Sequence, residues 1–279
     1  MKNVLIPIDL SDNSINALNY AQALLKNVPV NFYLLGVYIS NKSILLGDDY
    51  NKEWLNEMDN NVTENIKALA QKHNNKGNLK HSFKAITQAS SLLDAIKKVI
   101  QEKGIDLIVS GTKGASGLKE IFIGTNTLKF INSINNCPIL VIPSNYKFNK
   151  LHQVVFSTNY KRGFNSNELK VLINIALIHK AVIEVVQLTE ENYLTETQKI
   201  NKTQLQGYLE DFEFVFNKLD WEGSETETIK NHIENTNSEL LALINHKHNF
   251  FYKLTEENVI KKASFYSKIP LLILPEISV

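Results

Sequence analysis

The segment DLIVSGTKGASGLKEIFIGTNT, residues 106–127, decides the fold. It opens with a short apolar run, passes through a stretch punctuated by glycines, and ends in residues that can begin a helix. A buried strand, a glycine-rich turn and a helix start together favour anion binding, because glycines let backbone N–H groups approach the anion and the helix start offers unpaired amides. Thr125 and Asn126 suit the N-cap position. The segment therefore predicts an anion site at the end of a strand.

On both sides of this segment, short β-rich apolar runs alternate with longer runs of helical period. This alternation is typical of βαβ units with a parallel sheet. The first half predicts five strands, at 4–8, 31–38, 79–86, 106–110 and 138–142. Three apolar stripes predict helices, and their members are Ile15, Leu18, Ala21 and Leu25, then Leu92, Ile96, Val99 and Ile100, then Leu128, Ile131 and Ile134. The polar segment 51–73 predicts a surface helix.

The second half repeats this pattern in a degenerate form. Residues 154–156 (VVF) resemble residues 4–6 (VLI), 150 positions earlier, and residues 269–275 (IPLLILP) resemble residues 137–143 (CPILVIP), 132 positions earlier. The second copy predicts strands at 154–158, 182–187, 216–221, 240–244 and 271–274, with helices that include 166–178 and 193–215. We therefore expect an α/β protein of two doubly wound parallel-sheet domains, 1–145 and 146–279, joined by a short linker at 143–150.

Composition excludes several classes of protein. The net charge of +1 gives no general attraction to nucleic acid or to an anionic membrane. No window reaches the ~18 apolar residues of a membrane span, and Asp9 interrupts the apolar start, so we expect a cytoplasmic protein. Cys137 is the only cysteine, which excludes an internal disulfide, and its place before an apolar strand predicts a buried filler.

The glycine spacing resembles that of the ATP-binding members of the universal stress protein family. These carry Gly, two residues, Gly, nine residues and then Gly-Ser/Thr, and the positions that match are Gly111, Gly114, Gly124 and Thr125. Residues 6–11 (IPIDLS) and 35–37 (LGV) resemble the family's other nucleotide contacts, at the ends of strands one and two. The resemblance covers the first domain and, more faintly, the second. It implies a Rossmann-like, adenine nucleotide alpha hydrolase-like fold for both.

The resemblance also implies an ATP site where strands one and four are neighbours, at the switch point of the sheet. Pro7, Ile8 and Val37 would border the adenine, with Asp9 near the adenine and ribose. The remaining contacts would reach the ribose and the phosphates, and they are Ser110, Gly111, Lys113, Gly114, Gly124, Thr125 and Asn126. Mg²⁺ would accompany the phosphates.

Plainer interpretations of single residues stay open. Asp9 could cap the helix that follows it, as could Ser11 or Asp12, and Lys113 could be a solvated loop charge. The P-loop order Gly-x-x-x-x-Gly-Lys-Ser/Thr is absent from the sequence.

The second half lacks the motif. At the 132 offset its positions fall on Leu243, His246, Glu256 and Glu257. Two glutamates after the candidate cap Thr255 would satisfy a helix start and repel a triphosphate. Asn159 stands where Asp9 stands in the first half, so we expect nucleotide in the first half only.

Two other groups of residues in the second half favour ordinary roles. His246 and His248 are interpreted as solvated histidines, because no third metal ligand accompanies them at a matching spacing. An aromatic group is expected to serve the core or an interface, and its members are Phe212, Phe214, Phe216 and Trp221.

No catalytic set emerges from the sequence. The resemblance implies a stress-response regulator or sensor, at most a slow ATPase, with an unknown regulatory partner. A nucleotide-independent interaction module and a true ATP hydrolase remain the alternatives. Members of the family dimerise through their last strands, so residues 270–274 would pair with 138–142 as a pseudo-dimer within one chain. Such pairing removes an exposed edge, and a further homodimer stays open.

Overall fold

A computed structural model of the chain describes residues 1–38, 50–76, 78–112, 131–245 and 268–277. The first half contains β1 (Asn3–Pro7), α1 (Asp12–Leu24), β2 (Val30–Tyr38), α2 (Tyr50–Lys76), β3 (His81–Ala89), α3 (Leu92–Lys103), β4 (Leu107–Gly111) and β5 (Ile139–Ile142). The second half contains β6 (Gln153–Ser157), α5 (Ser166–His179), β7 (Val182–Gln187), the 3-10 helix η1 (Glu191–Tyr193), α6 (Glu196–Leu209), β8 (Phe214–Lys218), α7 (Glu225–Thr236), β9 (Leu240–Asn245) and β10 (Leu271–Pro275).

All ten predicted strands are confirmed, with ends that differ by a few residues. The predicted helix over 193–215 is wrong at both ends. Thr195 caps α6, which stops at Leu209, and Phe214 already belongs to β8. The phenylalanines at 212, 214 and 216 recur at the period of a strand, and this pattern outweighs the helical one.

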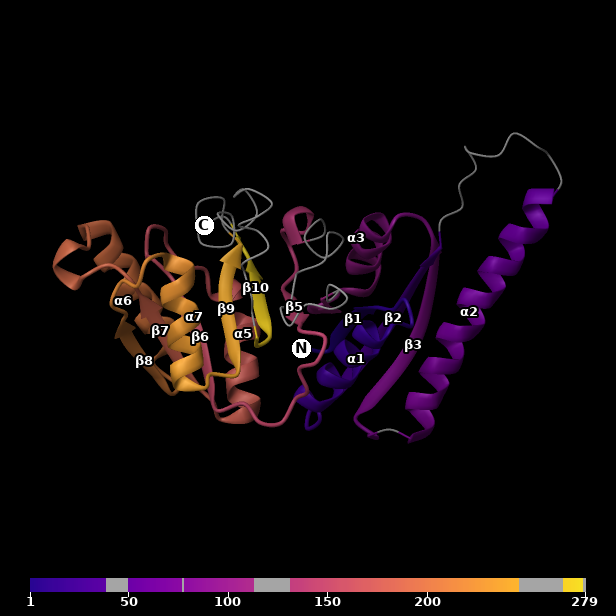
Figure 1. Cartoon of the computed structure of the whole chain (residues 1–279), viewed down its shortest axis with the longest axis horizontal. Helices are drawn as coiled ribbons and strands as arrows, with labels where there is room; N and C mark the ends of the chain where they lie inside the picture. Colours follow the sequence, from indigo (N-terminus) through magenta and orange to yellow (C-terminus); the bar gives the residue numbers. More distant parts are fainter. Residues whose placement is uncertain (39–49, 77, 113–130, 246–267, 278–279) are drawn as a thin grey trace.

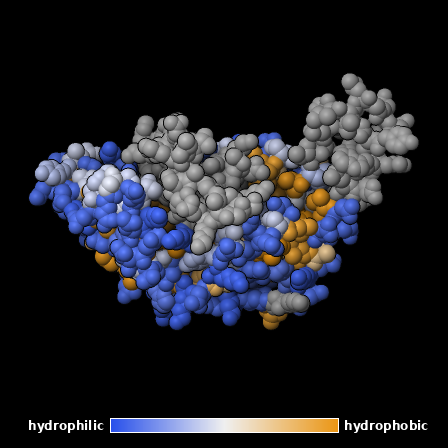
Figure 2. Space-filling model, in the orientation of Figure 1, coloured by the Kyte–Doolittle hydropathy of each residue, from blue (hydrophilic) through white to orange (hydrophobic). Residues whose placement is uncertain are grey.

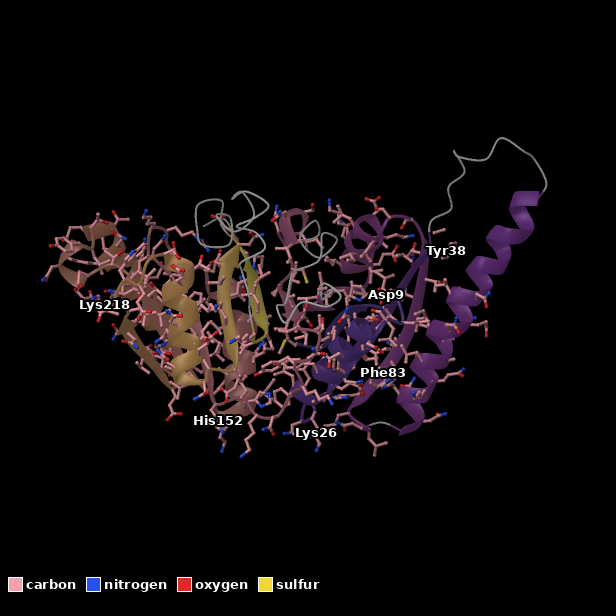
Figure 3. The ribbon with its side chains drawn as sticks, in the orientation of Figure 1. Asp9, Lys26, Tyr38, Phe83, His152 and Lys218 are labelled. Carbon is pink, nitrogen blue, oxygen red and sulfur yellow. The ribbon has the colours of Figure 1, made fainter. Side chains whose placement is uncertain are left out.

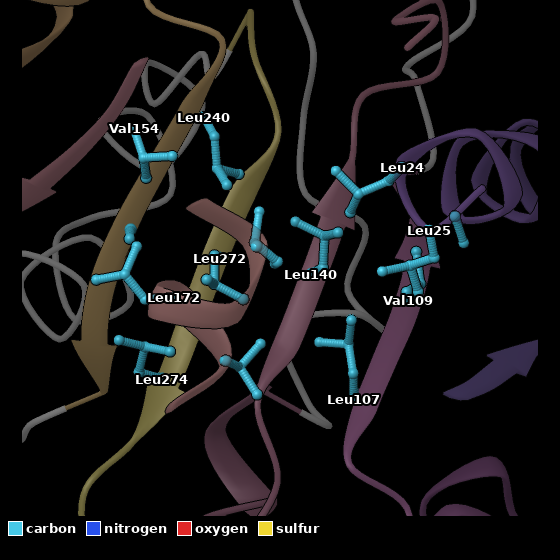
Figure 4. Packing of buried hydrophobic residues seen from close by; sticks show 14 of the residues in the cluster. Leu24, Leu25, Leu107, Val109, Leu140, Val154, Leu172, Leu240, Leu272 and Leu274 are labelled. Carbon is cyan, nitrogen blue, oxygen red and sulfur yellow. The ribbon is translucent and has the colours of Figure 1, made fainter. Parts of the chain in front are cut away.

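The ten strands form one continuous sheet in the order β3-β2-β1-β4-β5-β10-β9-β6-β7-β8, with helices on both faces (Figure 1). Strand pairs within each half are parallel, and β1 lies between β2 and β4 as expected. β5 and β10 pair antiparallel and join the halves, so the predicted pairing of the last strands is confirmed. Leu140 faces Leu272, its counterpart 132 residues later, which places a pseudo-twofold axis between them (Figure 4).

The linker between the halves packs against α1. The Asn16 side chain donates to the carbonyls of Pro143 and Tyr146, both at 3.1 Å. The Tyr20 ring lies 5.5 Å from the Phe148 ring. The two halves also meet directly, because His179 Nε2 of α5 lies 2.8 Å from the Leu24 carbonyl oxygen at the end of α1.

Two apolar clusters fill the two faces of the sheet. Successive residues of a strand point to opposite faces, so Ile6 and Val109 join the cluster that includes α1, whereas Leu5 and Ile108 join the cluster that includes α3. Ile131 and Ile134, from the third predicted stripe, are buried in this second cluster, and Leu128 lies outside the described residues.

Candidate functional site

The candidate site lies where the carboxyl ends of β1, β2 and β4 meet. The structure brings together six of the predicted site residues at this edge of the sheet, and they are Pro7, Ile8, Asp9, Val37, Ser110 and Gly111. The five others, Lys113, Gly114, Gly124, Thr125 and Asn126, lie outside the described residues. Figure 2 shows hydrophobic residues gathered on this half of an otherwise largely hydrophilic face.

Asp9 forms a turn at the end of β1 (Figure 3). Its Oδ1 accepts hydrogen bonds from Ser11 N at 3.0 Å and Ser11 Oγ at 2.5 Å. Partial burial of the carboxylate would raise the pKa of Asp9, but hydrogen bonds from Ser11 and Ser14 outweigh it and lower the pKa. Asp9 therefore carries a negative charge at neutral pH. Ser11 caps α1 by accepting from Ser14 N at 3.4 Å, which decides among the candidate caps.

Leu10 holds an unusual backbone conformation in this turn. Its φ is 62°, in the left-handed region that non-glycine residues rarely adopt, and its side chain is 44% exposed. Tyr160, 150 positions later, has a φ of 54°, and Asn159 Oδ1 accepts from Lys161 N at 3.0 Å. Both halves therefore keep the same turn, with a carboxylate in one and an amide in the other.

Gly111 has a packing role that sequence reasoning missed. A Cβ atom at this position would lie 2.5 Å from Asn13 O and 2.9 Å from Asn13 C, in the first turn of α1. Gly36 has a similar role, because a Cβ atom there would lie 2.8 Å from Ile66 Cγ1 of α2. Both glycines let a helix approach a strand end closely.

Thr112 is a further polar residue at this edge. Its N–H donates to the Ile142 carbonyl at 2.9 Å and so extends the β4 ladder by one residue. Alternation along the strand puts Gly111 toward α1, and Ser110 and Thr112 toward the face of α3. Thr112 is buried, and its Oγ1 has no hydrogen-bond partner within the part of the chain that the structure describes. The sequence could have indicated Thr112, because it stands two residues after Ser110 and so lies on the same face of the strand.

The second half differs from the first at the end of β9. Val4 pairs with Leu107 and Val154 with Leu240, so β9 follows β4 by 133 positions. The counterpart of Gly111 is therefore Ile244, and the assignment to Leu243 at the 132 offset is wrong. The 132 offset holds for β5 and β10 only, because the segment between β4 and β5 differs in length by one residue. A shift of one residue along a strand reverses the face of every side chain.

In the second half, residues of the turn between β6 and α5 cover the carboxyl end of β6. Its turn to α5 is longer, since the helix cap is Asn165 whereas the strand ends at Ser157. Tyr160 and Phe164 of this turn are buried in the core.

The helix α6 holds this longer turn. Gln198 donates to the Asn159 carbonyl at 2.8 Å, and Asn201 donates to the Tyr160 carbonyl at 2.8 Å. The counterpart of Gly36 is Gln187, which donates to Thr189 O at 2.9 Å. The second half therefore fills with side chains the places where the first half has glycines.

The described residues offer few other candidate reactive or metal-binding groups. Cys137 is buried, as predicted, and burial raises the pKa of its thiol to about 12. Within the described ranges, no three His, Cys, Asp or Glu side chains are grouped so that they could hold a metal ion. None of the helices in those ranges combines the length and the apolar character needed to cross a membrane.

Comparison with known proteins gives the family. The profile of the Universal stress protein family matches residues 1–143. The universal stress protein YxiE of Bacillus subtilis is 31% identical over 144 residues, which cover 50% of this chain and 97% of that protein. The universal stress protein MJ0577 of Methanocaldococcus jannaschii is 28% identical, over 50% of this chain and 94% of its own. A universal stress protein structure from Archaeoglobus fulgidus has the same fold over 98% of both chains, with a TM-score of 0.71 at 17% identity.

Proposed function

The chain belongs to the universal stress protein family, and we propose that it is an ATP-binding stress-response regulator or sensor whose first half alone binds the nucleotide. One observation carries the proposal. The ends of β1, β2 and β4 meet at the switch point of the sheet, and the four-position glycine motif begins at the last residue of β4. Ligands of doubly wound sheets bind at such a point.

The described residues fit a nucleoside. Pro7 and Val37, both partly exposed, would border an adenine beside the buried Ile8, and the ionised Asp9 would accept from the adenine or the ribose. Thr112 Oγ1 is buried and has no partner among the described residues, and because an unbonded buried hydroxyl costs about 1–3 kcal/mol, it is suited to bond to a bound molecule. The phosphates would extend from there toward Lys113, Gly114, Gly124, Thr125 and Asn126, with Mg²⁺ accompanying them.

Four features support restriction of the nucleotide to the first half. Ile244 replaces Gly111, Gln187 replaces Gly36, and the Tyr160 side chain is buried where the side chain of Leu10 is exposed. Asn159 also lacks the charge of Asp9. The second half would then act as the fixed partner of the first through β5 and β10.

Calorimetric titration with ATP, ADP and AMP tests the proposal. The wild-type protein should bind ATP. The Gly114→Val variant should show no heat of binding, because a side chain would prevent close approach of the backbone to phosphate. Asp9→Ala and Asn159→Ala form a matched pair, since each removes the acceptor of the same turn. Only Asp9→Ala should weaken ATP binding. Unchanged affinity in Gly114→Val, or equal loss in both turn variants, would contradict the assignment.

Natively purified protein also distinguishes an ATP-binding regulator from the two alternatives, an interaction module and an ATP hydrolase. A regulator should release nucleotide when natively purified protein is heat-denatured, and mass spectrometry detects it. Phosphate release should stay far below the typical turnover of an enzyme, ~10 s⁻¹. Absence of any nucleotide would favour the interaction module, and fast turnover would favour a hydrolase.

A further inference from the structure

The outermost strand of the second half, β8, has an open edge. In the described sheet β8 pairs with β7 on one side and has no strand on the other. Ile183 N–H donates to the Glu213 carbonyl at 2.9 Å, and Leu219 N–H donates to the Gln187 carbonyl at 2.8 Å. Since successive residues direct their backbone groups to opposite sides, the N–H and C=O groups of Phe214, Phe216 and Lys218 point to the open side.

The opposite end of the sheet is protected. There α2 packs along the edge strand β3 (Figure 1). The Asn74 side chain closes the outward groups of Phe83. Phe83 N–H donates to Asn74 Oδ1 at 2.9 Å, and Asn74 Nδ2 donates to the Phe83 carbonyl at 3.0 Å. A side-chain amide thus takes the place of a neighbouring strand. Proteins often cover sheet edges in this way to prevent unwanted pairing.

The counterpart of Phe83 is Phe214, and no side chain of the described residues bonds to its outward groups. Asn74 stands nine residues before Phe83, whereas the residue nine before Phe214 is Leu205, a buried leucine of α6 whose side chain can neither donate nor accept. Among the described residues, the chain therefore protects one edge of its sheet and leaves the equivalent edge open.

The sequence around β8 is acidic, and Lys202 of α6, which lies 4.8 Å from the centre of the Phe216 ring, is itself paired with Glu191. Between residues 210 and 222, Lys218 is the only cation, whereas the carboxylates are Glu210, Asp211, Glu213, Asp220 and Glu222. Hydrogen bonds that Lys218 donates to Asp220 and Glu190 raise the pKa of Lys218, and its ammonium lies 2.6 Å and 2.5 Å from their oxygens. Its charge is thus locally compensated. Val215 and Trp221, 44% and 62% exposed, add apolar surface beside these charges.

We propose that the open edge of β8 binds an extended, lysine- or arginine-rich segment of another protein as an eleventh strand. The backbone groups of Phe214, Phe216 and Lys218 supply the ladder, and the carboxylates at both ends of β8 attract the cations of the segment. A second copy of this chain fits less well. Its β3 edge is closed by Asn74, and two β8 edges would place like charges together.

A fluorescent peptide of alternating lysine and valine tests the proposal, with a glutamate and valine peptide as the matched control. Fluorescence anisotropy should show binding of the lysine peptide alone, weaker at high salt. Amide hydrogen exchange measured by NMR should slow at Phe214, Phe216 and Lys218 when this peptide is added. Val215 and Asn217, whose amides point to β7, should change little. Equal slowing at all five amides, or none, would overturn the assignment.

Two variants at one position isolate the backbone contribution. Lys218→Pro and Lys218→Ala both remove the cation, but only Lys218→Pro removes an outward N–H, which edge strands tolerate. Lys218→Pro should lower the affinity for the lysine peptide about tenfold relative to Lys218→Ala. Equal affinity of the two variants would overturn the strand pairing.

Charge reversal keeps the proposal testable if the proline variant unfolds. The double variant Glu213→Lys, Glu222→Lys should lose the lysine peptide, whereas the double variant Glu64→Lys, Glu102→Lys, on the first half, should keep it. Equal loss of peptide binding in both double variants would show general electrostatic attraction without a defined site, and would overturn the proposal. Sedimentation that shows self-association through β8, with no peptide binding, would assign the edge to a second copy and overturn the proposal.

Discussion

At the scale of the residue, Gly111 connects the fold to the candidate site. Ala at this position would put a Cβ atom 2.5 Å from a backbone oxygen of α1, which cannot move without shifting the helix. We expect Gly111→Ala to lower the free energy of unfolding by about 1–3 kcal/mol, the cost of overpacking a core.

Urea denaturation measures this cost, and Gly207→Ala is the matched control. Gly207 lies inside α6, where an added Cβ atom has no contact within 4 Å. Ala there should stabilise the chain by about 0.5–1 kcal/mol, because glycine is a poor helix former. If both variants shift stability in the same direction, the close approach of α1 is not what requires Gly111.

Asp9 gives a second prediction at this scale, on pH. Its lowered pKa means that the ionised form stabilises the folded chain above the pKa of the unfolded state, and that this contribution is lost as pH falls through the folded pKa. A carbon-detected NMR titration should place the pKa of Asp9 below that of an unfolded peptide. Ser11→Ala should raise it, because the Ser11 hydroxyl donates to the carboxylate. An unchanged pKa in Ser11→Ala would contradict the assigned cause.

At the scale of the element, a buried carboxylate fixes α7 on the sheet. Glu184 of β7 lies 2.9 Å from His232 Nε2 of α7 and accepts from Asn217 of β8 at 2.8 Å. Burial would raise the pKa of Glu184, but hydrogen bonds from His232, Asn217 and Gln153 outweigh it and lower the pKa. The ionised Glu184 therefore stabilises the second half above the pKa of the unfolded state, and less as pH falls through the folded pKa.

Removing the histidine tests this anchor. His232→Ala leaves Glu184 short of a partner in a buried place, so we expect a loss of about 1–3 kcal/mol at neutral pH. His152→Ala is the control, because His152 also pairs with a glutamate, Glu239, but its side chain is 67% exposed. Exposed pairs contribute about 0–1 kcal/mol. Equal effects of the two variants in thermal unfolding would show that burial of the pair does not matter.

The elements themselves could be predicted from the sequence, because periods of two and of 3.6 residues depend only on which residues are apolar. Finer features of the fold could not be predicted from the sequence. The 133 offset of β9 depends on backbone pairing, which similarity at the chain ends does not reveal. The packing reason for Gly111 depends on where α1 begins, and the open groups of Phe214 depend on which side chain the preceding helix places beside them. Each is a relation between segments far apart in the chain.

The candidate site was predictable in part for a related reason. A motif fixes residue types, so Gly111 and Asp9 could be named from the sequence. Thr112 could be placed on the same strand face as Ser110, but its burial, and the lack of a partner for its Oγ1 among the described residues, are known only from the structure. Lys113 and the motif beyond it stay predictions, since they lie outside the described residues.

At the scale of the whole molecule, the two halves complete each other through β5 and β10. Without the second half, β5 would present unpaired backbone groups and the apolar side chains of Ile139, Leu140 and Val141. The near-twofold pairing of Leu140 with Leu272 shows that a second β5 could take the place of β10, with Leu140 facing Leu140. We therefore expect residues 1–145 alone to form a homodimer, which light scattering coupled to gel filtration would show as a doubled mass. Leu140→Lys in that fragment should give a monomer, because charge on an edge strand opposes pairing. A wild-type fragment that is folded by circular dichroism yet monomeric would mean that the second half persists for some reason other than covering this edge.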